Sequence, residues 1–253
     1  MTPKIAVIGI GYIGLPLALN LGKYYSTIAY DIDKRLIFRL SKNIDINNEV
    51  LEIDFKKSKN ISFTSNILDL KTCNYYIITV PTPVDKKNDP DLTILIKVIK
   101  KISSYLKLDD TIILESTIYP GATDEVVIPL IEKISKLKLN KDFHVCYSPE
   151  RANPGDKVHN ITNIPKIISA SSNKGLKNIE KIYQKIIKAN LVKVSNIRTA
   201  EAAKIIENTQ RDVNIALINE FSMFCKKMKI NINEVLTASK TKWNFLNFKP
   251  GLV

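Results

Sequence analysis

A lysine and an asparagine four residues apart are the first side chains in this sequence whose spacing suggests chemistry. Lys204 and Asn208 occur in the run AKIIEN, inside a long segment with helical apolar spacing. Residues four apart share one face of a helix, so these side chains can either face solvent or converge on one ligand. The run alone leaves both interpretations open.

A glycine-rich turn near the N-terminus is the second candidate. Residues 4–8 form a short apolar run of strand type, GIGYIG follows, and LPLALNLG then has helical spacing. The glycines of the resulting G-x-G-x-x-G pattern are Gly9, Gly11 and Gly14. This pattern is typical of a turn that holds a dinucleotide pyrophosphate at a helix N-terminus. The alternative is an ordinary glycine-rich turn.

The second predicted strand indicates which dinucleotide would bind. Residues 26–31 end in Asp31, where a carboxylate can accept a hydrogen bond from a ribose 2′-hydroxyl and disfavours a 2′-phosphate. The sequence therefore predicts NAD as the cofactor. The alternative is a surface aspartate without a ligand.

Strands and helices alternate along the first 200 residues or so of this chain. Further strands are predicted at 75–80, 111–115, 143–147, 166–169 and 191–194. Helices are predicted at 91–106, 123–137, 174–188, 199–229 and 232–240. This order predicts an α/β fold with a Rossmann-like, doubly wound, mostly parallel sheet. The expected domains are 1–196, which binds NAD, and an incomplete helical central domain at 197–253.

Three predicted strands end in unusual segments: PTPVD after residue 80, STIYPG after 115, and SPERANPG after 147. Ligands of doubly wound sheets bind at the carboxyl ends of the strands. Thr82 and Thr117 offer uncharged hydroxyls there, and Glu150 offers a partly desolvated carboxylate for proton transfer. The alternative for each segment is that its prolines only shape turns.

Composition narrows the possible partners. The net charge of +13 comes from lysines scattered among other residues, which favours a solvated surface over nucleic-acid binding. Three cysteines without CxxC spacing suggest neither a disulfide framework nor a metal site. No run approaches the roughly 18 apolar residues of a membrane span. We therefore expect a soluble protein of the reducing cytoplasm, without a membrane or nucleic-acid partner.

Five motifs in order, GIGYIG, VPTP, ESTIYPG, SPERANPGD and EAAKIIENTQRDVNIALINE, resemble the UDP-glucose/GDP-mannose dehydrogenase family. The segment YSPERANPGDKVHNITNIPKIISA is most similar to bacterial enzymes that oxidise UDP-N-acetylhexosamines. The resemblance implies NAD-dependent oxidation of a sugar C6 alcohol to a carboxylate in two hydride transfers, with UDP-GlcNAc or UDP-GalNAc favoured. It also implies a role in capsule or O-antigen synthesis and a homodimer formed through the helix at 199–229.

The resemblance also implies residue roles. The implied catalytic residues are Lys204, Asn208, Glu150 and Thr117. The implied NAD contacts are Gly9, Gly11, Tyr12, Ile13, Gly14, Asp31, Arg35, Thr82 and Thr117. The implied contacts to the UDP-sugar are Arg151, Ala152, Lys204, Asn208 and Arg211. The UDP-glucose branch has a second Glu where this chain has Pro154, so that role is not carried over.

The second hydride transfer needs a thiolate, because an aldehyde gives up hydride readily as a thiohemiacetal. Cys73 precedes a predicted strand, Cys146 lies within one, and Cys225 lies late in the long helix. Each is expected to be a small buried hydrophobe. In the family a Gly-Gly-His-Cys run and a UDP-binding domain follow the KPGLV segment, at which these 253 residues end. The sequence therefore predicts a chain that binds NAD but makes little or no uronic acid alone.

Two other functions stay open. A 3-hydroxyacid or 6-phosphogluconate-type dehydrogenase also places Lys and Asn four apart on a helix, but VPTP and SPERANPG are foreign to that group. An NAD-binding regulatory or assembly module would keep the glycine turn without catalysis. The sequence does not distinguish among the N-acetylhexosamine epimers.

Overall fold

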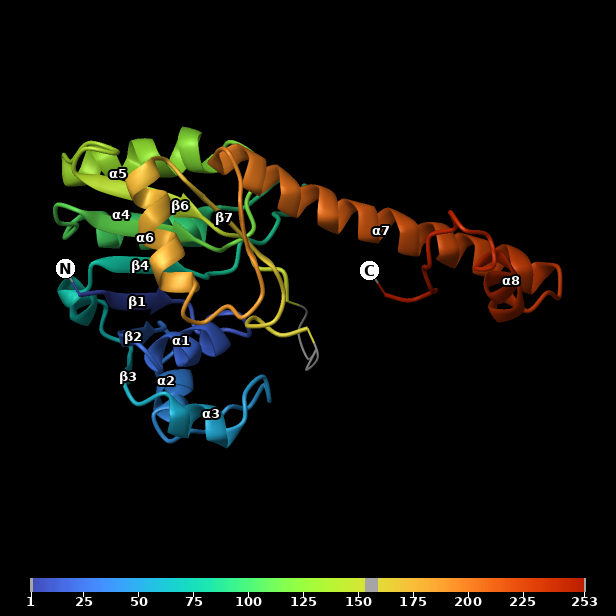
Figure 1. The fold of residues 1–253 in the computed structure, drawn as a ribbon, viewed down its shortest axis with the longest axis horizontal. Coiled ribbons are helices and arrows are strands. Elements are labelled where there is room, and N and C mark those ends of the chain that lie inside the picture. The colour runs from blue at the N-terminus through green and yellow to red at the C-terminus, as the bar shows by residue number, and fades with distance from the viewer. Residues whose placement is uncertain (1, 153–158, 253) are drawn as a thin grey trace. The chain divides into compact units, whose positions relative to one another are not determined.

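The computed structural model describes residues 2–152 and 159–252. Within them, eight strands form one sheet in the order β3-β2-β1-β4-β5-β6-β7-β8 (Figure 1). The strands are β1 (Lys4–Ile8), β2 (Ser26–Tyr30), β3 (Ile61–Thr64), β4 (Tyr75–Ile78), β5 (Asp110–Leu114), β6 (Phe143–Tyr147), β7 (Lys166–Ala170) and β8 (Leu191–Lys193). Their neighbours pair in parallel except β6 and β7, which are antiparallel. The predicted doubly wound, mostly parallel sheet is confirmed.

Helices connect the strands of this sheet. They are α1 (Gly14–Gly22), α2 (Lys34–Leu40), α3 (Glu52–Lys57), α4 (Thr93–Ser103), α5 (Ile128–Ser135) and α6 (Asn173–Tyr183), with a 3₁₀ turn at Ile67–Thr72 and a π turn at Thr123–Val127. Helices α1 and α6 contribute to the same hydrophobic cluster, together with alternate residues of the central strands such as Ile5, Val7 and Ile77. Helices α4 and α5 pack against each other.

The central strands are buried along their whole length, which explains their sequences. In β4, β5 and β6 every residue is buried. Strands covered on both faces read as nearly continuous apolar runs, and YYII, DTIIL and FHVCY have that character. These runs are the reason that the sheet could be predicted from periodicity.

The sequence reading missed the elements between β2 and β4. Helix α2 begins after Asp33, whose carboxylate accepts hydrogen bonds from the backbone N–H groups of Arg35 and Leu36. Aspartate is a favoured N-cap residue, so this signal was present in the sequence. Strand β3 is a short edge strand that is only half-buried, and its pattern ISFT lacks a strong apolar signature.

The chain divides into two compact units, Met1–Ala202 and Ala203–Val253, and the division falls inside helix α7 (Ile197–Lys227). Helix α7 begins after Asn196, whose side-chain oxygen accepts from the backbone N–H of Thr199 at 2.8 Å. The second unit also contains α8 (Ile232–Ser239). There, the Asn219 amide exchanges two hydrogen bonds with the backbone of Gly251, at 2.8 and 2.9 Å.

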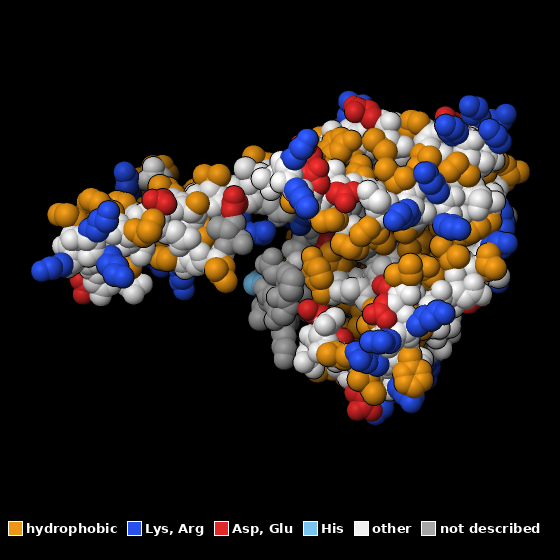
Figure 2. All heavy atoms as spheres, turned by 180° about the vertical axis from the view of Figure 1, so that it is seen from behind, with side chains coloured by type: hydrophobic (Ala, Val, Ile, Leu, Met, Phe, Trp, Pro, Cys, Tyr) orange, Lys and Arg blue, Asp and Glu red, His pale blue; other side chains and the backbone are white. Residues whose placement is uncertain are grey.

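The surface charge is distributed without a continuous basic strip on the face drawn in Figure 2. Lys and Arg side chains there are interleaved with hydrophobic and acidic ones. Across residues 2–152 and 159–252, none of the helices combines the length and apolar character that crossing a membrane requires.

Candidate functional site

The glycine turn lies at the carboxyl end of β1, where the strand order reverses between β1 and β4. Gly9 has φ +96°, a backbone conformation that favours glycine. A Cβ on Gly14 would lie 1.9 Å from the Gly9 carbonyl oxygen, so only glycine lets α1 start this close to the turn. The Thr79 hydroxyl donates to the carbonyls of Ile8 and Gly9, at 3.1 and 2.7 Å, and holds the turn against the end of β4.

Gly11 differs from these two glycines. A Cβ added there would meet no protein atom within 4 Å. Packing therefore does not require glycine at this position. A ligand that approaches the backbone does require it, which is the role of the second glycine in a dinucleotide-binding turn.

Asp31 follows β2 at the same sheet edge. Its Oδ2 accepts from the backbone N–H of Ile10 at 2.8 Å, which ties the end of β2 to the glycine turn. Its Oδ1 accepts from the N–H of Asp33 at 2.9 Å. A carboxylate has about four acceptor positions, so it can still accept from ribose hydroxyls. Arg35, in the first turn of α2, is exposed. These residues fit an NAD cofactor.

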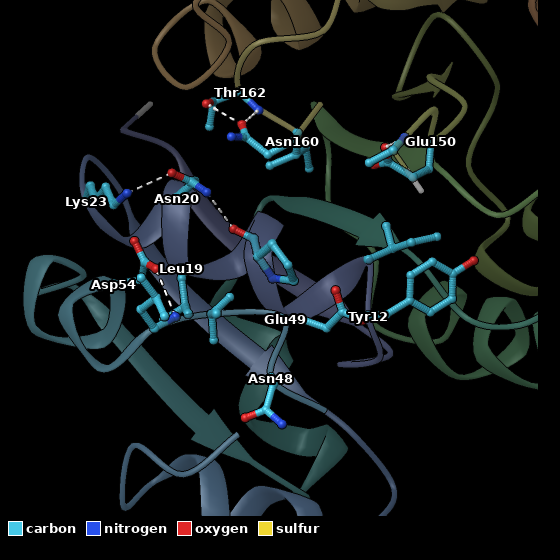
Figure 3. A pocket seen from close by; sticks show the side chains of 16 residues that line it. Tyr12, Leu19, Asn20, Lys23, Asn48, Glu49, Asp54, Glu150, Asn160 and Thr162 are labelled. Carbon is cyan, nitrogen blue, oxygen red and sulfur yellow. Dashed lines mark hydrogen bonds between the residues drawn. The ribbon is translucent and has the colours of Figure 1, made fainter. Parts of the chain in front are cut away.

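A cavity of about 340 Å³ joins the cofactor turn to the segment after β6. It is lined by Tyr12 and Ile13, which directly precede α1, and by Glu150 and Ala152 from that segment. Figure 3 shows Tyr12 and Glu150 at one end of the cavity and Lys23, Asn20 and Asp54 at the other. Burial raises the pKa of the Tyr12 phenol, and the Glu150 and Glu49 charges raise it further. The structure thus brings together two predicted NAD contacts, one predicted catalytic residue and one predicted UDP-sugar contact.

The two predicted threonines meet at the ends of adjacent strands. The Thr82 hydroxyl donates to the backbone carbonyl of Thr117 at 2.5 Å. Ser116, between β5 and Thr117, donates its hydroxyl to the carbonyl of Val80 at 2.6 Å. These bonds hold the VPTP segment against the STIYPG segment.

Glu150 is almost fully buried, with 4% of its surface exposed. Its Oε1 accepts from the backbone N–H groups of Arg151 and Ala152, at 2.7 and 2.5 Å. Its Oε2 lies 3.9 Å from the Lys166 ammonium. The Arg151 guanidinium donates to the carbonyl of Pro165 at 2.9 Å. Pro154 lies outside the described residues.

The remaining predicted residues lie in the second unit. Lys204, Asn208 and Arg211 are in one continuous helix, α7, as the four-residue spacing predicted. The Arg211 guanidinium donates to the Asn208 side-chain oxygen at 3.1 Å. Lys204 and Asn208 are both partly exposed, so both can reach a ligand.

Sequence reasoning missed several charged residues at this sheet edge. Glu115 and Lys166 are buried, and Lys166 Nζ lies 3.0 Å from Glu115 Oε2. Glu201 is also fully buried and accepts from the backbone N–H of Gly121 at 2.6 Å. The available signal was a single charged residue directly beside an apolar run: Glu115 follows one, and Lys166 precedes one. A charge in that position is buried only if the fold supplies a partner.

The three cysteines are free and buried, as the sequence predicted. Burial raises the pKa of the Cys73 thiol to about 11 and that of the Cys146 thiol further still. Neither is therefore a thiolate near neutral pH. In the part of the chain that the structure describes, no group of three His, Cys, Asp or Glu residues could hold a metal ion.

Comparisons with known proteins agree with this geometry. Residues 3–187 match the NAD binding domain of the UDP-glucose/GDP-mannose dehydrogenase family. Residues 198–253 match the central domain of the same family.

Curated and solved relatives are similar along the whole chain. It is 47% identical over 250 residues to the UDP-N-acetyl-D-glucosamine 6-dehydrogenase of Salmonella typhi. That match covers 99% of this chain and 59% of the relative. It is 50% identical over 253 residues to Protein CapL of Staphylococcus aureus, in a match that covers 100% of this chain and 59% of that protein. The solved structure of the UDP-D-ManNAc dehydrogenase from Pyrococcus horikoshii matches with a TM-score of 0.90 at 32% identity. The match covers 98% of this chain and 60% of that one. The chain therefore spans less than two thirds of the length of these relatives.

Proposed function

Because this chain belongs to the UDP-glucose/GDP-mannose dehydrogenase family, we propose that it supplies the cofactor site and part of the catalytic site of a nucleotide-sugar 6-dehydrogenase. The proposed substrate is a UDP-N-acetylhexosamine, with UDP-GlcNAc or UDP-GalNAc favoured, whose C6 alcohol becomes a carboxylate. The observation that carries the proposal is the cavity shared by the start of α1 and the Glu150 segment. It joins a dinucleotide turn to a buried carboxylate.

The chain's own residues have distinct proposed roles in this reaction. NAD, when bound, supplies the acceptor for the hydride that leaves C6. Gly11 allows its pyrophosphate to approach the backbone, and Asp31 accepts from its ribose. Glu150 takes a proton from the water that cleaves the final acyl intermediate. Lys204 and Asn208 stabilise the oxyanion that develops at C6.

We propose that the nucleophilic thiol of the second oxidation is none of the three cysteines described above. Cys73, Cys146 and Cys225 are all buried, and a nucleophile must reach the aldehyde carbon. The 253-residue chain should therefore bind NAD and make little or no uronic acid alone.

We also propose a homodimer that forms through α7. Val213, Leu217, Phe221 and Phe224 are spaced at i, i+4, i+8 and i+11, so they form one stripe on this helix. Their exposed fractions of 58%, 60%, 42% and 51% are high for large apolar side chains. A continuous exposed apolar stripe marks an interaction surface.

The test compares NADH formation by the 253-residue chain and by a longer polypeptide extended through a Gly-Gly-His-Cys segment and a UDP-binding domain. Each is offered UDP-GlcNAc, UDP-GalNAc, UDP-ManNAc and UDP-glucose. We expect turnover from the extended polypeptide only, with about two NADH for each sugar because two hydrides leave. Lys204→Ala in the extended polypeptide should lower kcat by about 10²–10³ without changing NAD affinity.

An NAD-binding module without catalysis is the second candidate function, and the burial of the cysteines favours it. If the extended polypeptide binds NAD but oxidises none of the four sugars, this second function replaces the first. Robust uronate formation by the 253-residue chain would instead contradict the proposal that none of its three cysteines is the nucleophile.

A further inference from the structure

A buried cluster of ionisable side chains lies directly against Glu150. Lys166 Nζ is 3.0 Å from Glu115 Oε2 and 3.9 Å from Glu150 Oε2. The Tyr183 hydroxyl donates to Glu115 Oε1. The side chains of Glu115, Lys166 and Glu150 are 0%, 4% and 5% exposed. One ammonium is therefore shared by two carboxylates in the interior.

The antiparallel strand β7 explains why these residues meet. Glu115 follows the carboxyl end of β5, and Glu150 follows that of β6. Lys166 opens β7, and because β7 runs opposite to β6, its first residue lies at the same sheet edge. Tyr183, the last residue of α6, approaches from the helix that packs on β6 and β7. Four separate elements thus place the cluster.

The cluster is built to hold the ammonium in one position. The Lys166 ammonium lies 5.1 Å from the centre of the Tyr183 ring, in cation-π range. Burying an ion is costly unless it is paired and hydrogen-bonded, and Glu115 supplies that partner. Burial raises the pKa of the Glu115 carboxyl, and the Glu150 charge raises it further, whereas Lys166 and the Tyr183 hydrogen bond act in the opposite direction.

Two further ionisable groups face this cluster. Burial raises the pKa of the Tyr147 phenol, and the charges of Glu201 and Glu115 add to that effect. Tyr12 lies at the same end of the cavity as Glu150, whose charge raises the pKa of the Tyr12 phenol. Both phenols are neutral near physiological pH, and Lys166 is a cation that lies within 4 Å of both carboxylates.

We propose that Lys166 and Glu115 are positioning residues for Glu150: the Lys166 ammonium holds the Glu150 carboxylate ionised, and Glu115 holds that ammonium in place. This inference rests on the proposed function, in which Glu150 takes a proton from water. When Glu150 takes up this proton, the net charge of Glu115, Lys166 and Glu150 together changes from one negative charge to zero. Glu115 keeps Lys166 paired in both states, so protonated Glu150 does not leave an unpaired buried cation behind.

The first test reads the carboxyl groups directly, without turnover. Infrared spectra of the 253-residue chain, recorded across a pH series, follow the carbonyl band of protonated carboxylic acids. In Lys166→Met the two carboxylates lose their cation, so one of them should stay protonated to higher pH, by about 1–3 pH units. Lys166→Arg keeps the charge and should titrate as the wild type does.

A second variant keeps the test decisive if Lys166→Met does not fold. Glu115→Gln preserves shape and leaves Lys166 paired with Glu150 alone, so Glu150 should protonate at lower pH than in the wild type. The band that is lost in Glu115→Gln identifies Glu115, and the band that is lost in Glu150→Gln identifies Glu150. Unchanged titration midpoints in the folded variants would overturn the proposal.

The second test uses the extended polypeptide and separates this inference from the proposed function. Lys166→Met should move the rising limb of the kcat-pH profile to higher pH with little change in KM, whereas a purely structural role would lower kcat equally at all pH values. A shifted infrared band without any sugar oxidation would keep the charge-holding role and remove the proposed function. Normal sugar oxidation by Lys166→Met with an unshifted rising limb of the kcat-pH profile would keep the proposed function and remove the charge-holding role.

Discussion

At the scale of single residues, the three glycines of the cofactor turn have different physical reasons to be glycine. Gly14 is required by the protein itself, because a Cβ there would lie 1.9 Å from the Gly9 carbonyl oxygen. Gly11 has no protein atom within 4 Å of a Cβ position. A ligand that approaches the backbone would account for glycine at that position, which makes the two residues a matched pair for mutation.

Gly11→Ala should leave the free energy of unfolding nearly unchanged and weaken NAD binding by tenfold or more, since about 1.4 kcal/mol of steric conflict with the ligand suffices for that factor. Gly14→Ala should instead destabilise the fold by about 1–3 kcal/mol, as overpacking does. Urea unfolding and calorimetric NAD titration measure the two effects. Unchanged NAD affinity in Gly11→Ala would mean that no pyrophosphate lies against this turn.

At the scale of elements, the start of α7 is attached to the turn after β5 by one buried carboxylate. Glu201 accepts from the backbone N–H of Gly121 at 2.6 Å, and from the N–H and hydroxyl of Thr123 at 3.1 and 2.6 Å. The same junction carries two exposed ion pairs, from Arg198 to Asp124 and to Glu125, at 2.9 and 3.2 Å. The buried contacts should dominate, because exposed ion pairs are screened by water.

Glu201→Ala should lower the free energy of unfolding by about 1–3 kcal/mol for each buried N–H that loses its acceptor. Glu125→Ala, at the same junction, should cost less than about 1 kcal/mol, because its partner is solvated. Urea midpoints of the two variants, together with hydrogen exchange at Gly121 and Thr123, measure the difference. Equal destabilisation by both variants would show that burial does not set the strength of this attachment.

At the scale of the whole molecule, the apolar stripe of α7 (Val213, Leu217, Phe221 and Phe224) decides whether the chain is expected to associate. Phe221 and Phe224 lie with their ring centres 5.5 Å apart, next to a hollow lined by Leu217 and Glu220. A second copy of the same stripe would cover these side chains by an isologous contact, the commonest geometry of homodimers.

Leu217→Glu should convert the proposed dimer to monomer, because a carboxylate in an apolar contact must be desolvated without a partner. Lys226→Glu is the matched control: position 226 lies nine residues on, on the opposite side of the helix, and is exposed. Sedimentation velocity over a range of concentrations distinguishes the two species. A wild-type chain that stays monomeric at every concentration would refute the dimer.

The sequence by itself determined the features that depend on local spacing. Runs such as KIAVI and YYII identified the buried strands, and GIGYIG identified the cofactor turn, because each signal lies within a few consecutive residues. The four-residue spacing of Lys204 and Asn208 likewise placed both on one helix. The short elements β3 and α3 were missed because edge strands and six-residue helices carry little periodicity.

Only the tertiary structure decided which charged residues surround Glu150. Glu115 and Lys166 are 51 positions apart, and they meet because β7 runs antiparallel to β6, an orientation that no local pattern encodes. Glu201 and Gly121 are 80 positions apart and meet for the same kind of reason. The physical cause is that a buried charge is tolerated only where the complete fold delivers its partner, and that partner can come from any distance along the chain.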